Sequence, residues 1–98
     1  MTNNRRIWTK EEHMIACHVY FNRRSYRDPV SYVASLLHRT IGSINMRFGN
    51  YDYFATNGAA GLENGGAMAK GIYMEYSKNP VESSRKALDL IKQYEGRI

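Results

Sequence analysis

Apolar residues recur along most of this chain with the spacing expected of amphipathic helices. Positions three and four apart repeat as hydrophobic, and polar residues lie between them, which indicates one buried face per helix. No stretch shows a convincing strand pattern of strict alternation. The pattern predicts five helices, at residues 10–22, 29–38, 41–51, 67–77 and 80–95.

Each predicted helix has positions that we expect to be buried. These are Ile15, Ala16, Val19 and Tyr20 in the first helix, Val30, Val33, Ala34 and Leu37 in the second, Ile44, Phe48 and Tyr51 in the third, Met68, Ile72 and Tyr76 in the fourth, and Leu88, Ile91 and Tyr94 in the fifth. The predicted fold class is therefore all-α. At 98 residues the chain has room for one small domain with a modest core.

Helix start signals define most of these boundaries. Thr9 and Glu12 have the spacing of a capping box, in which each side chain bonds to the backbone amide of the other residue. Asp28 can cap the second helix, with Pro29 at its first position, where the missing N–H costs nothing. Thr40 is a good cap for the third helix, which leaves only about two residues between the second and third helices.

The remaining segments are predicted to be loops. Residues 55–66 are small and rich in glycine, and we expect Leu62 to contact the core from this loop. Residues 1–7 are a polar lead-in with two arginines, which we interpret as a flexible basic arm of the single domain, residues 1–98. Trp8 stands just before the first helix and should fold against it or its neighbour.

The helix pair at 29–51 carries the strongest functional signal. Its short connection forces the two helices to cross sharply, which is the helix-turn-helix arrangement. Away from its buried face, the third helix has small, polar and cationic side chains in place of the usual Glu/Lys surface. Such a helix is suited to insertion into the major groove of DNA. A plain helical hairpin in the core, with similar periodicity, is the structural alternative.

The candidate DNA-binding residues come from this helix pair. They are Arg39, Thr40, Ser43, Asn45, Met46, Arg47 and Asn50. The threonine and the serine lie at the helix start, where backbone amides and the helix dipole attract phosphate. The asparagines match the donor and acceptor of adenine, and the arginines match guanine or phosphate. The methionine could contact a thymine methyl group, or it is an exposed apolar residue without a role.

The net charge of +5 lies entirely in the first half of the chain. Residues 1–50 hold eight Lys/Arg against three acids, whereas residues 51–98 hold six of each sign. A polyanion would therefore dock on the first half. The candidate phosphate contacts are Arg5, Arg6, Arg23, Arg24 and Arg27. The first two could also form an arm into the minor groove. A solvated basic surface that only aids solubility is the alternative.

The sequence gives little support to catalysis or metal binding. No nucleophile motif and no phosphate-binding glycine loop of the right form occur, so we expect neither an enzyme nor a cofactor. His13 and Cys17 stand one helical turn apart, with His18 and His38 as further candidate ligands. A zinc site usually needs a second closely spaced pair, which this chain lacks, so we expect no metal.

Cysteine content and hydropathy bear on the cellular compartment. Cys17 is the single cysteine, which excludes an internal disulfide and fits a reducing cytoplasm. No apolar run reaches membrane-spanning length, and the N-terminus lacks a secretory signal. We therefore expect a cytoplasmic protein without a membrane partner.

Three motifs resemble one known domain. They are Trp-Thr-x-Glu-Glu at 8–12, Arg-Thr-x-x-Ser-Ile-x-Met-Arg-x-x-Asn-Tyr at 39–51, and Gly-Leu-x-Asn-Gly at 61–65. In this order they look like the N-terminal helical DNA-binding domain of bacterial HNH restriction-type endonucleases, over residues 8–80. The resemblance implies DNA recognition on behalf of a nuclease. The residues that match the family motif are Arg39, Thr40, Ser43, Arg47 and Asn50.

Two departures from that family affect the interpretation. Asn45 occupies a position where a small apolar residue is expected, so base preference could differ. The nuclease half, with the His and Asn that hold its metal, does not follow within these 98 residues. We therefore expect a free-standing copy that binds without cutting, from a virus or mobile element.

The first functional hypothesis is a non-catalytic binder of double-stranded DNA that regulates, or competes with, a nuclease. The alternative is a protein-binding anti-defence module that inhibits a host nuclease or another defence protein, since an exposed Met46 and abundant tyrosine also fit a protein interface. A homodimer is compatible with two DNA half-sites, although no coiled-coil seam indicates one.

Overall fold

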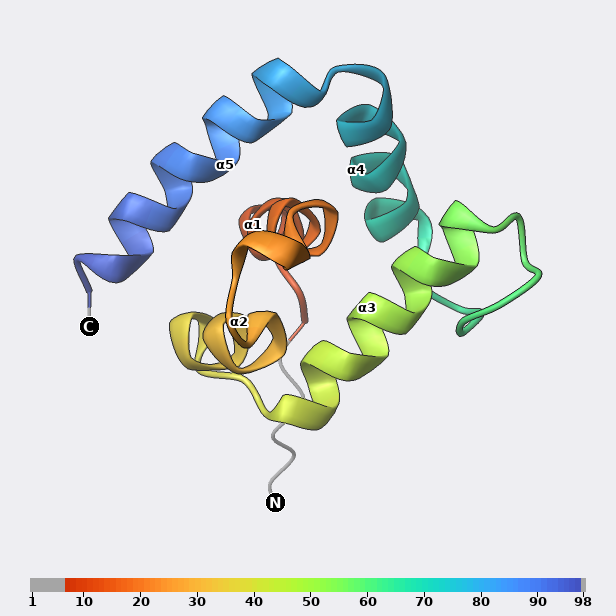
Figure 1. Cartoon of the computed structure of the whole chain (residues 1–98), viewed down its shortest axis with the longest axis horizontal. Helices are drawn as coiled ribbons and strands as arrows, with labels where there is room; N and C mark the ends of the chain where they lie inside the picture. Colours follow the sequence, from red (N-terminus) through yellow and green to blue (C-terminus); the bar gives the residue numbers. More distant parts are fainter. Residues whose placement is uncertain (1–6, 98) are drawn as a thin grey trace.

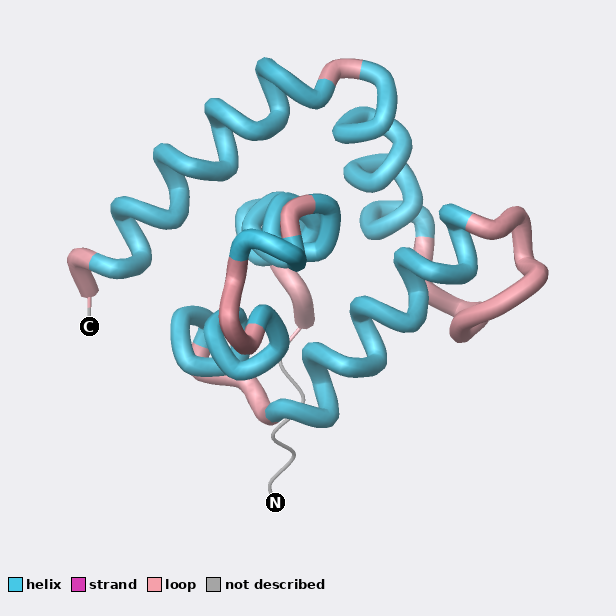
Figure 2. The backbone as a smooth tube through the Cα atoms, in the orientation of Figure 1, coloured by secondary structure: helices cyan, strands magenta, loops and turns pink. Residues whose placement is uncertain are grey.

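Five α-helices account for most of residues 7–97, the part of the chain that the computed structural model describes (Figure 1). They are α1 (Lys10–Phe21), α2 (Pro29–Leu37), α3 (Ile41–Ala55), α4 (Ala67–Lys78) and α5 (Pro80–Glu95), with a 3-10 turn, η1 (Arg23–Ser25), after α1. Loops connect the helices, and no strand occurs in these residues (Figure 2). The prediction of an all-α fold with five helices is confirmed.

The predicted start signals are present as helix caps. Thr9 Oγ1 accepts a hydrogen bond from the Glu12 amide at 3.1 Å, and the Glu12 carboxylate accepts one from the Thr9 amide at 3.0 Å. Asp28 and Thr40 likewise accept amide hydrogens in the first turns of α2 and α3. These bonds satisfy amide groups that have no partner within the helix. The sequence therefore encodes these helix starts locally.

α3 extends further than the hydrophobic pattern predicts. The pattern places its end at residue 51, whereas the helix continues to Ala55. Phe54 still packs against the core, so the additional turn buries apolar surface. Thr56 then closes the helix, because its amide and its hydroxyl both donate to the Asp52 carbonyl, at 3.1 and 2.8 Å.

α1 lies at the centre of the domain and packs against all four other helices. In Figure 1 it is seen nearly end-on, with α3, α4 and α5 arranged around it. Its buried residues are Glu12, His13, Ile15, Ala16, Cys17, His18, Val19 and Tyr20. A helix that is buried on most sides is expected to be apolar around most of its circumference. Its three buried polar side chains need partners inside the protein, and one of them leads to the candidate site.

The predicted buried faces agree with the structure in α1 and α3 and agree only in part in α4 and α5, where Tyr76 and Ile91 are buried as predicted. In α2 the agreement extends to all positions except Val30, which is partly buried. The buried residues of the last two helices are Ala69, Tyr73 and Tyr76 in α4, and Ala87 and Ile91 in α5. Met68 is instead 51% exposed and Leu88 45% exposed. Both helices place an alanine at the contact, which allows close approach of their axes.

Three residues connect α2 to α3, one more than predicted. The first, His38, has a left-handed backbone with φ of 55°, and the last, Thr40, is extended. Figure 1 shows α2 nearly end-on and α3 in the plane of the view, so the two helices cross steeply. This crossing and the short turn give the helix-turn-helix arrangement predicted for residues 29–51.

Candidate nucleic-acid interface

The residues predicted to contact DNA fall into two groups. The first group is exposed or half-buried at the start of α3 and consists of Thr40, Ser43, Asn45 and Met46. The second group takes part in contacts within the protein and consists of Arg39, Arg47 and Asn50. The contacts of the second group limit which side chains a duplex could reach.

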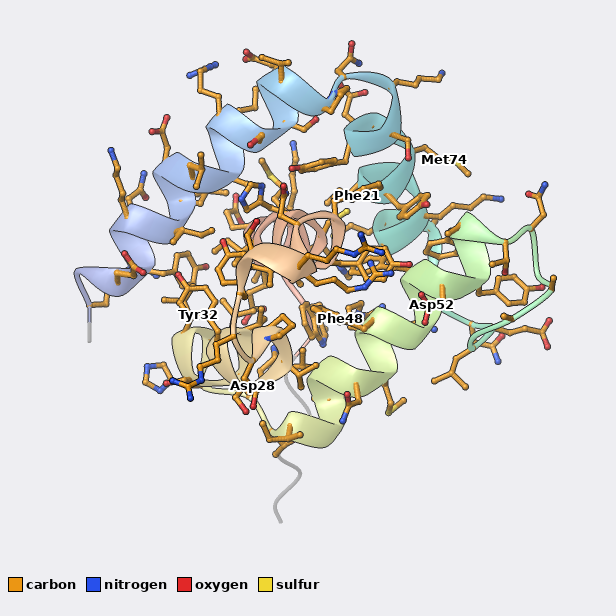
Figure 3. The ribbon with its side chains drawn as sticks, in the orientation of Figure 1. Phe21, Asp28, Tyr32, Phe48, Asp52 and Met74 are labelled. Atoms are coloured by element: carbon orange, nitrogen blue, oxygen red, sulfur yellow. The ribbon has the colours of Figure 1, made fainter. Side chains whose placement is uncertain are left out.

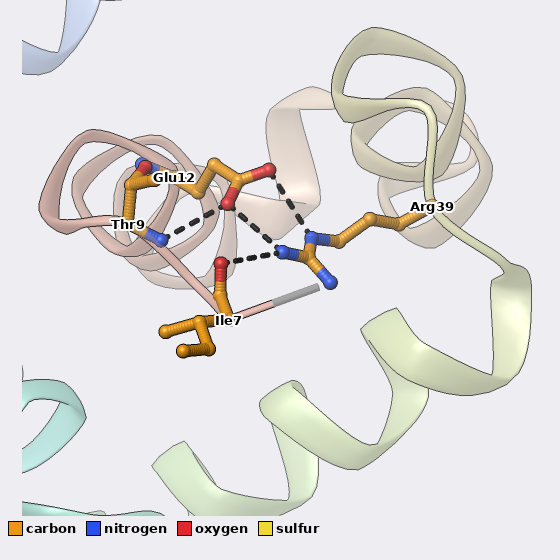
Figure 4. Close-up of polar contacts among 4 residues, drawn as sticks. All are labelled: Ile7, Thr9, Glu12 and Arg39. Carbon is orange, nitrogen blue, oxygen red and sulfur yellow. Dashed lines mark hydrogen bonds and ion pairs between the residues drawn. The ribbon is translucent and has the colours of Figure 1, made fainter. Parts of the chain in front are cut away.

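Arg39 forms a buried ion pair with Glu12 (Figure 4). Its Nε and Nη2 atoms donate to the two carboxylate oxygens at 3.1 and 3.0 Å, and Nη2 also donates to the Ile7 carbonyl at 3.2 Å. Only 8% of either side chain is exposed. Because Glu12 is buried at the start of α1, its charge needs a partner, which Arg39 supplies. The expectation that Arg39 is available to DNA is therefore wrong.

The ring of Trp8 connects this ion pair to α3. The guanidinium carbons of Arg39 and Arg47 lie 4.5 and 4.7 Å from the ring centre, and His13 stacks on the ring at 5.3 Å. Cations are attracted to an aromatic face. Burial, reinforced by the charge of Arg47, lowers the pKa of His13 to about 4. The imidazole is thus neutral at neutral pH and adds no third positive charge to this cluster.

Arg47 is bonded to the glycine-rich loop that follows α3. Its Nη1 atom donates to the Gly65 carbonyl at 2.9 Å and to Asn50 Oδ1 at 3.2 Å. Its Nε atom is buried and has no hydrogen-bond partner. Burial lowers the pKa of the guanidinium from its usual value. A contact between Arg47 and a base would require the Nη1 bonds to break, so its observed role is to hold the loop against α3.

Asn50 is buried and its amide group is fully engaged. Only 7% of the residue is exposed. Its Nδ2 atom donates to the carbonyls of Leu62 and Glu63, at 2.9 and 3.1 Å, while Oδ1 accepts from Arg47. The prediction that Asn50 contacts a base edge is wrong, because this side chain lies under the loop.

These contacts bring the three resemblance motifs together in space. The network contains Trp8 and Glu12 from the first motif, Arg39, Arg47 and Asn50 from the second, and Leu62, Glu63 and Gly65 from the third. Contact between the three motifs was not predicted from the sequence. The residue types did indicate it, because the acid and the indole ring of the first motif complement the two arginines of the second. Much of the shared pattern therefore encodes the fold.

The glycine-rich loop also covers the outer face of the second half of α3. The Leu62 amide donates to the Gly49 carbonyl at 2.9 Å, and a Cβ atom at Gly49 would lie 2.8 Å from Leu62 Cδ1. Gly61 has φ of +88°, and a Cβ there would lie 2.4 Å from the Gly49 carbonyl and 2.5 Å from the Tyr53 amide. The expectation that Leu62 contacts the core is wrong: Leu62 is 47% exposed, is not among the residues packed against the core, and lies on Gly49 at the surface of α3.

The loop leaves the first two turns of α3 uncovered, and we call their accessible residues the α3 tip. The α3 tip consists of Thr40, Ile41, Gly42, Ser43, Asn45 and Met46. Thr40 Oγ1 accepts from the Ser43 amide at 3.0 Å. Met46 is 63% exposed, and a Cβ at Gly42 would meet no atom within 4 Å. The positive end of the helix dipole lies here, which favours a negatively charged partner.

The loop between α1 and α2 carries three arginines, Arg23, Arg24 and Arg27. Arg23 donates to the Tyr20 carbonyl at 2.8 Å and lies 4.4 Å from the Tyr20 ring centre. The Tyr20 hydroxyl in turn donates to Asp52 at 2.6 Å. Figure 3 shows Asp52 on α3. Arg24 and Arg27 are exposed in the same loop.

Asn45 lies seven residues before Asp52 and so shares that flank of α3. Through Tyr20, Arg23 at the start of this loop therefore lies towards the flank of α3 that Asn45 and Asp52 share. Arg5 and Arg6, the other candidate phosphate contacts, lie outside the described residues.

On its other side the α3 tip borders a shallow groove of about 560 Å³. Its apolar lining residues are Trp8, Met46 and Leu62. Polar groups line the rest, among them Ser43 and Glu63. A groove of this mixed character fits side chains of a protein partner as well as a nucleic acid.

The histidine and cysteine side chains near α1 serve the core. Cys17 is buried, and burial raises the pKa of its thiol, so it is unreactive. His18 Nδ1 lies 2.8 Å from the Tyr76 hydroxyl, which also accepts from Asn22 at 3.0 Å. Within residues 7–97, no three His, Cys, Asp or Glu side chains are grouped to hold a metal ion.

The chain has no match in the comparisons with known proteins: no family model, no curated protein and no solved structure resembles it closely enough. Among the described residues, no helix has the length and apolar composition that a bilayer crossing requires. The chemistry of the α3 tip and its surroundings therefore has to carry the functional argument.

Proposed function

We propose that the chain is a non-catalytic double-stranded DNA-binding protein that inserts the α3 tip into the major groove. The observation that carries this proposal is the steep helix-turn-helix crossing, which leaves the first two turns of α3 open. In helix-turn-helix proteins, residues near the N-terminus of the second helix contact base edges. By occupying its binding sites on DNA, such a protein would regulate a gene or compete with a nuclease for those sites.

The proposed interface assigns different work to the two groups of candidate residues. Asn45 and Met46 would contact base edges, and the amides at the start of α3 would face phosphate. Arg39 and Arg47 would not contact DNA, but would hold α3 against Trp8 and the loop. A rigid support of this kind favours binding, since little side-chain or loop entropy is lost on docking.

The exposed arginines of the α1–α2 loop would supply the phosphate contacts. Residues 7–50 contain six Lys/Arg and three acids, an excess of three positive charges. Arg39 is neutralised by Glu12, so the charge that a duplex would meet comes mainly from the loop. Each phosphate contact releases counterions and makes binding dependent on salt. Arg24 and Arg27, which are exposed in this loop, would take this role.

The test is fluorescence anisotropy of a labelled duplex over a range of salt concentrations. The double variant Arg24→Ala/Arg27→Ala should lower the slope of log K against log[salt] by about 2, since each phosphate contact contributes about 0.9. Lys78→Ala/Lys92→Ala removes the same charge from exposed positions on α4 and α5 and should leave the slope unchanged. Equal slopes for the two double variants would dismiss the loop as a contact surface.

A protein partner is the second candidate, and the groove lined by Trp8, Met46 and Leu62 favours it. In this case the chain would inhibit a nuclease or another defence protein by covering its surface. The duplex titration separates the two functions. Absence of any duplex binding at low salt and micromolar protein would favour the protein partner.

A further inference from the structure

We infer that the α3 tip reads the C5 methyl group of a pyrimidine, in thymine or 5-methylcytosine, beside an adenine. This inference rests on the proposed function and specifies which groups of the duplex are recognised. Three residues that lie side by side at the start of α3 carry it: Gly42, Asn45 and Met46.

Gly42 lies within α3 without a reason in the fold. A Cβ at this position would meet no atom within 4 Å, and its φ is not positive. Glycine is unfavourable inside a helix compared with alanine, because it loses more backbone freedom on folding. A glycine on an open helix surface allows another molecule to approach the backbone closely. Gly42 thus leaves room for a ligand that docks on the α3 tip to approach the helix backbone closely.

Met46 and Asn45 lie one turn after Gly42, at the i+4 and i+3 positions, and so flank it on the helix surface. Met46 is 63% exposed, and its flexible apolar side chain is suited to contact a methyl group. In the major groove, the C5 methyl is the apolar group that distinguishes thymine from the other unmodified bases. Asn45 is exposed and offers the donor and acceptor that pair with adenine N7 and N6.

The loop confines this recognition to the α3 tip. Beyond Met46, the outer face of α3 is covered where Leu62 lies on Gly49 and Gly61 packs on Tyr53. The loop therefore keeps this face of the second half of the helix away from base edges. Discrimination between sequences is concentrated in very few side chains, so the loss of one methyl contact should be measurable.

The experiment begins with duplexes enriched from a random pool by binding to the protein. Each enriched duplex is then prepared with uracil in place of thymine, and separately with 5-methylcytosine in place of cytosine. Removal of a contacted thymine methyl should weaken binding about fourfold, from the transfer free energy of one buried methylene-sized group. Met46→Ala should abolish the difference between thymine and uracil. The matched control, Met68→Ala, removes a methionine that is 51% exposed on α4 and should preserve this difference.

A second pair of variants tests the close approach at Gly42. Gly42→Ala adds a methyl group on the α3 tip and should weaken duplex binding at least tenfold while leaving the protein folded. Gly71→Ala adds the same group to α4, also in open space, and should leave binding unchanged. Thermal melting of both variants checks that neither loses stability, as expected when alanine replaces an open helical glycine.

The outcomes separate this inference from the proposed function. Salt-dependent duplex binding with equal affinity for thymine and uracil forms would refute methyl recognition and leave DNA binding intact. Discrimination that persists in Met46→Ala would refute the role of Met46. Failure to bind any duplex would overturn both the inference and the proposed function.

Discussion

The buried ion pair between Arg39 and Glu12 makes a quantitative prediction about stability. Arg39→Met keeps much of the side-chain volume but removes the guanidinium. The Glu12 carboxylate, 8% exposed, then loses both arginine hydrogen bonds, while the bond from the Thr9 amide remains. Breaking a buried pair by removing one partner typically costs about 3–5 kcal/mol. This is a large share of the roughly 5–15 kcal/mol that stabilises an ordinary small domain.

Urea denaturation followed by far-ultraviolet circular dichroism measures this loss. With a typical slope of about 1.5 kcal/mol per molar urea, the midpoint for Arg39→Met should fall by roughly 2–3 M. Arg85 provides the control, because its ion pairs with Glu82 and Asp89 lie on the exposed surface of α5. Arg85→Met should leave the midpoint nearly unchanged, since exposed pairs contribute little.

The loss of stability in Arg39→Met shows whether the Arg39–Glu12 ion pair is buried or exposed to solvent. A loss below about 1 kcal/mol, the range of exposed pairs, would mean that water screens Arg39 and Glu12 in solution. The arginine would then be accessible, and its exclusion from the DNA interface would be wrong. Duplex affinity of Arg39→Met, measured where the variant remains folded, should fall only by the small effect of one distant charge.

Three further predictions concern the loop and the histidines. Asn50→Ala removes both bonds to the loop carbonyls and should cost about 1–3 kcal/mol, seen as faster amide hydrogen exchange in the loop. Gly61→Ala should destabilise the domain in thermal melting, because its positive φ and the close α3 backbone leave no room for a Cβ. The pKa of His13 falls from its usual 6.5 to about 4 on folding, so the unfolded chain binds more protons. Stability in urea titrations should therefore decrease as the pH falls from 6.5 towards 4. His13→Phe should weaken this pH dependence and leave a contribution from His18, whose pKa is also lowered by burial.

Local signals explain why so much of the fold could be predicted from the sequence. Capping residues such as Thr9, Asp28 and Thr40 act on amides within three or four residues, so their effect is visible in a short window. The buried faces of the helices that pack against α1 can likewise be predicted from a short window, because apolar residues recur there with the helical period. α4 is less predictable, because Met68 and Ala69 are both apolar and only the packing of neighbouring helices decides which one is buried.

The candidate site was harder to predict because its decisive contacts are distant in sequence. Glu12 and Arg39 are 27 residues apart, and Arg47 and Gly65 are 18 apart. A pattern of small, polar and cationic residues on a helix describes a DNA-reading surface and an internal polar network equally well. Asn45 has no such partner among the described contacts and is exposed, as predicted. Asn50 is instead buried.

The position of the single tryptophan gives the molecule an intrinsic optical probe. Indole emission responds to nearby charges and to water, and here it would originate where α1, α3 and the glycine-rich loop meet. Release of the loop, loss of either arginine or arrival of a ligand in the adjoining groove should each alter the spectrum. Label-free fluorescence could thus follow assembly of this junction and its occupancy in the same sample.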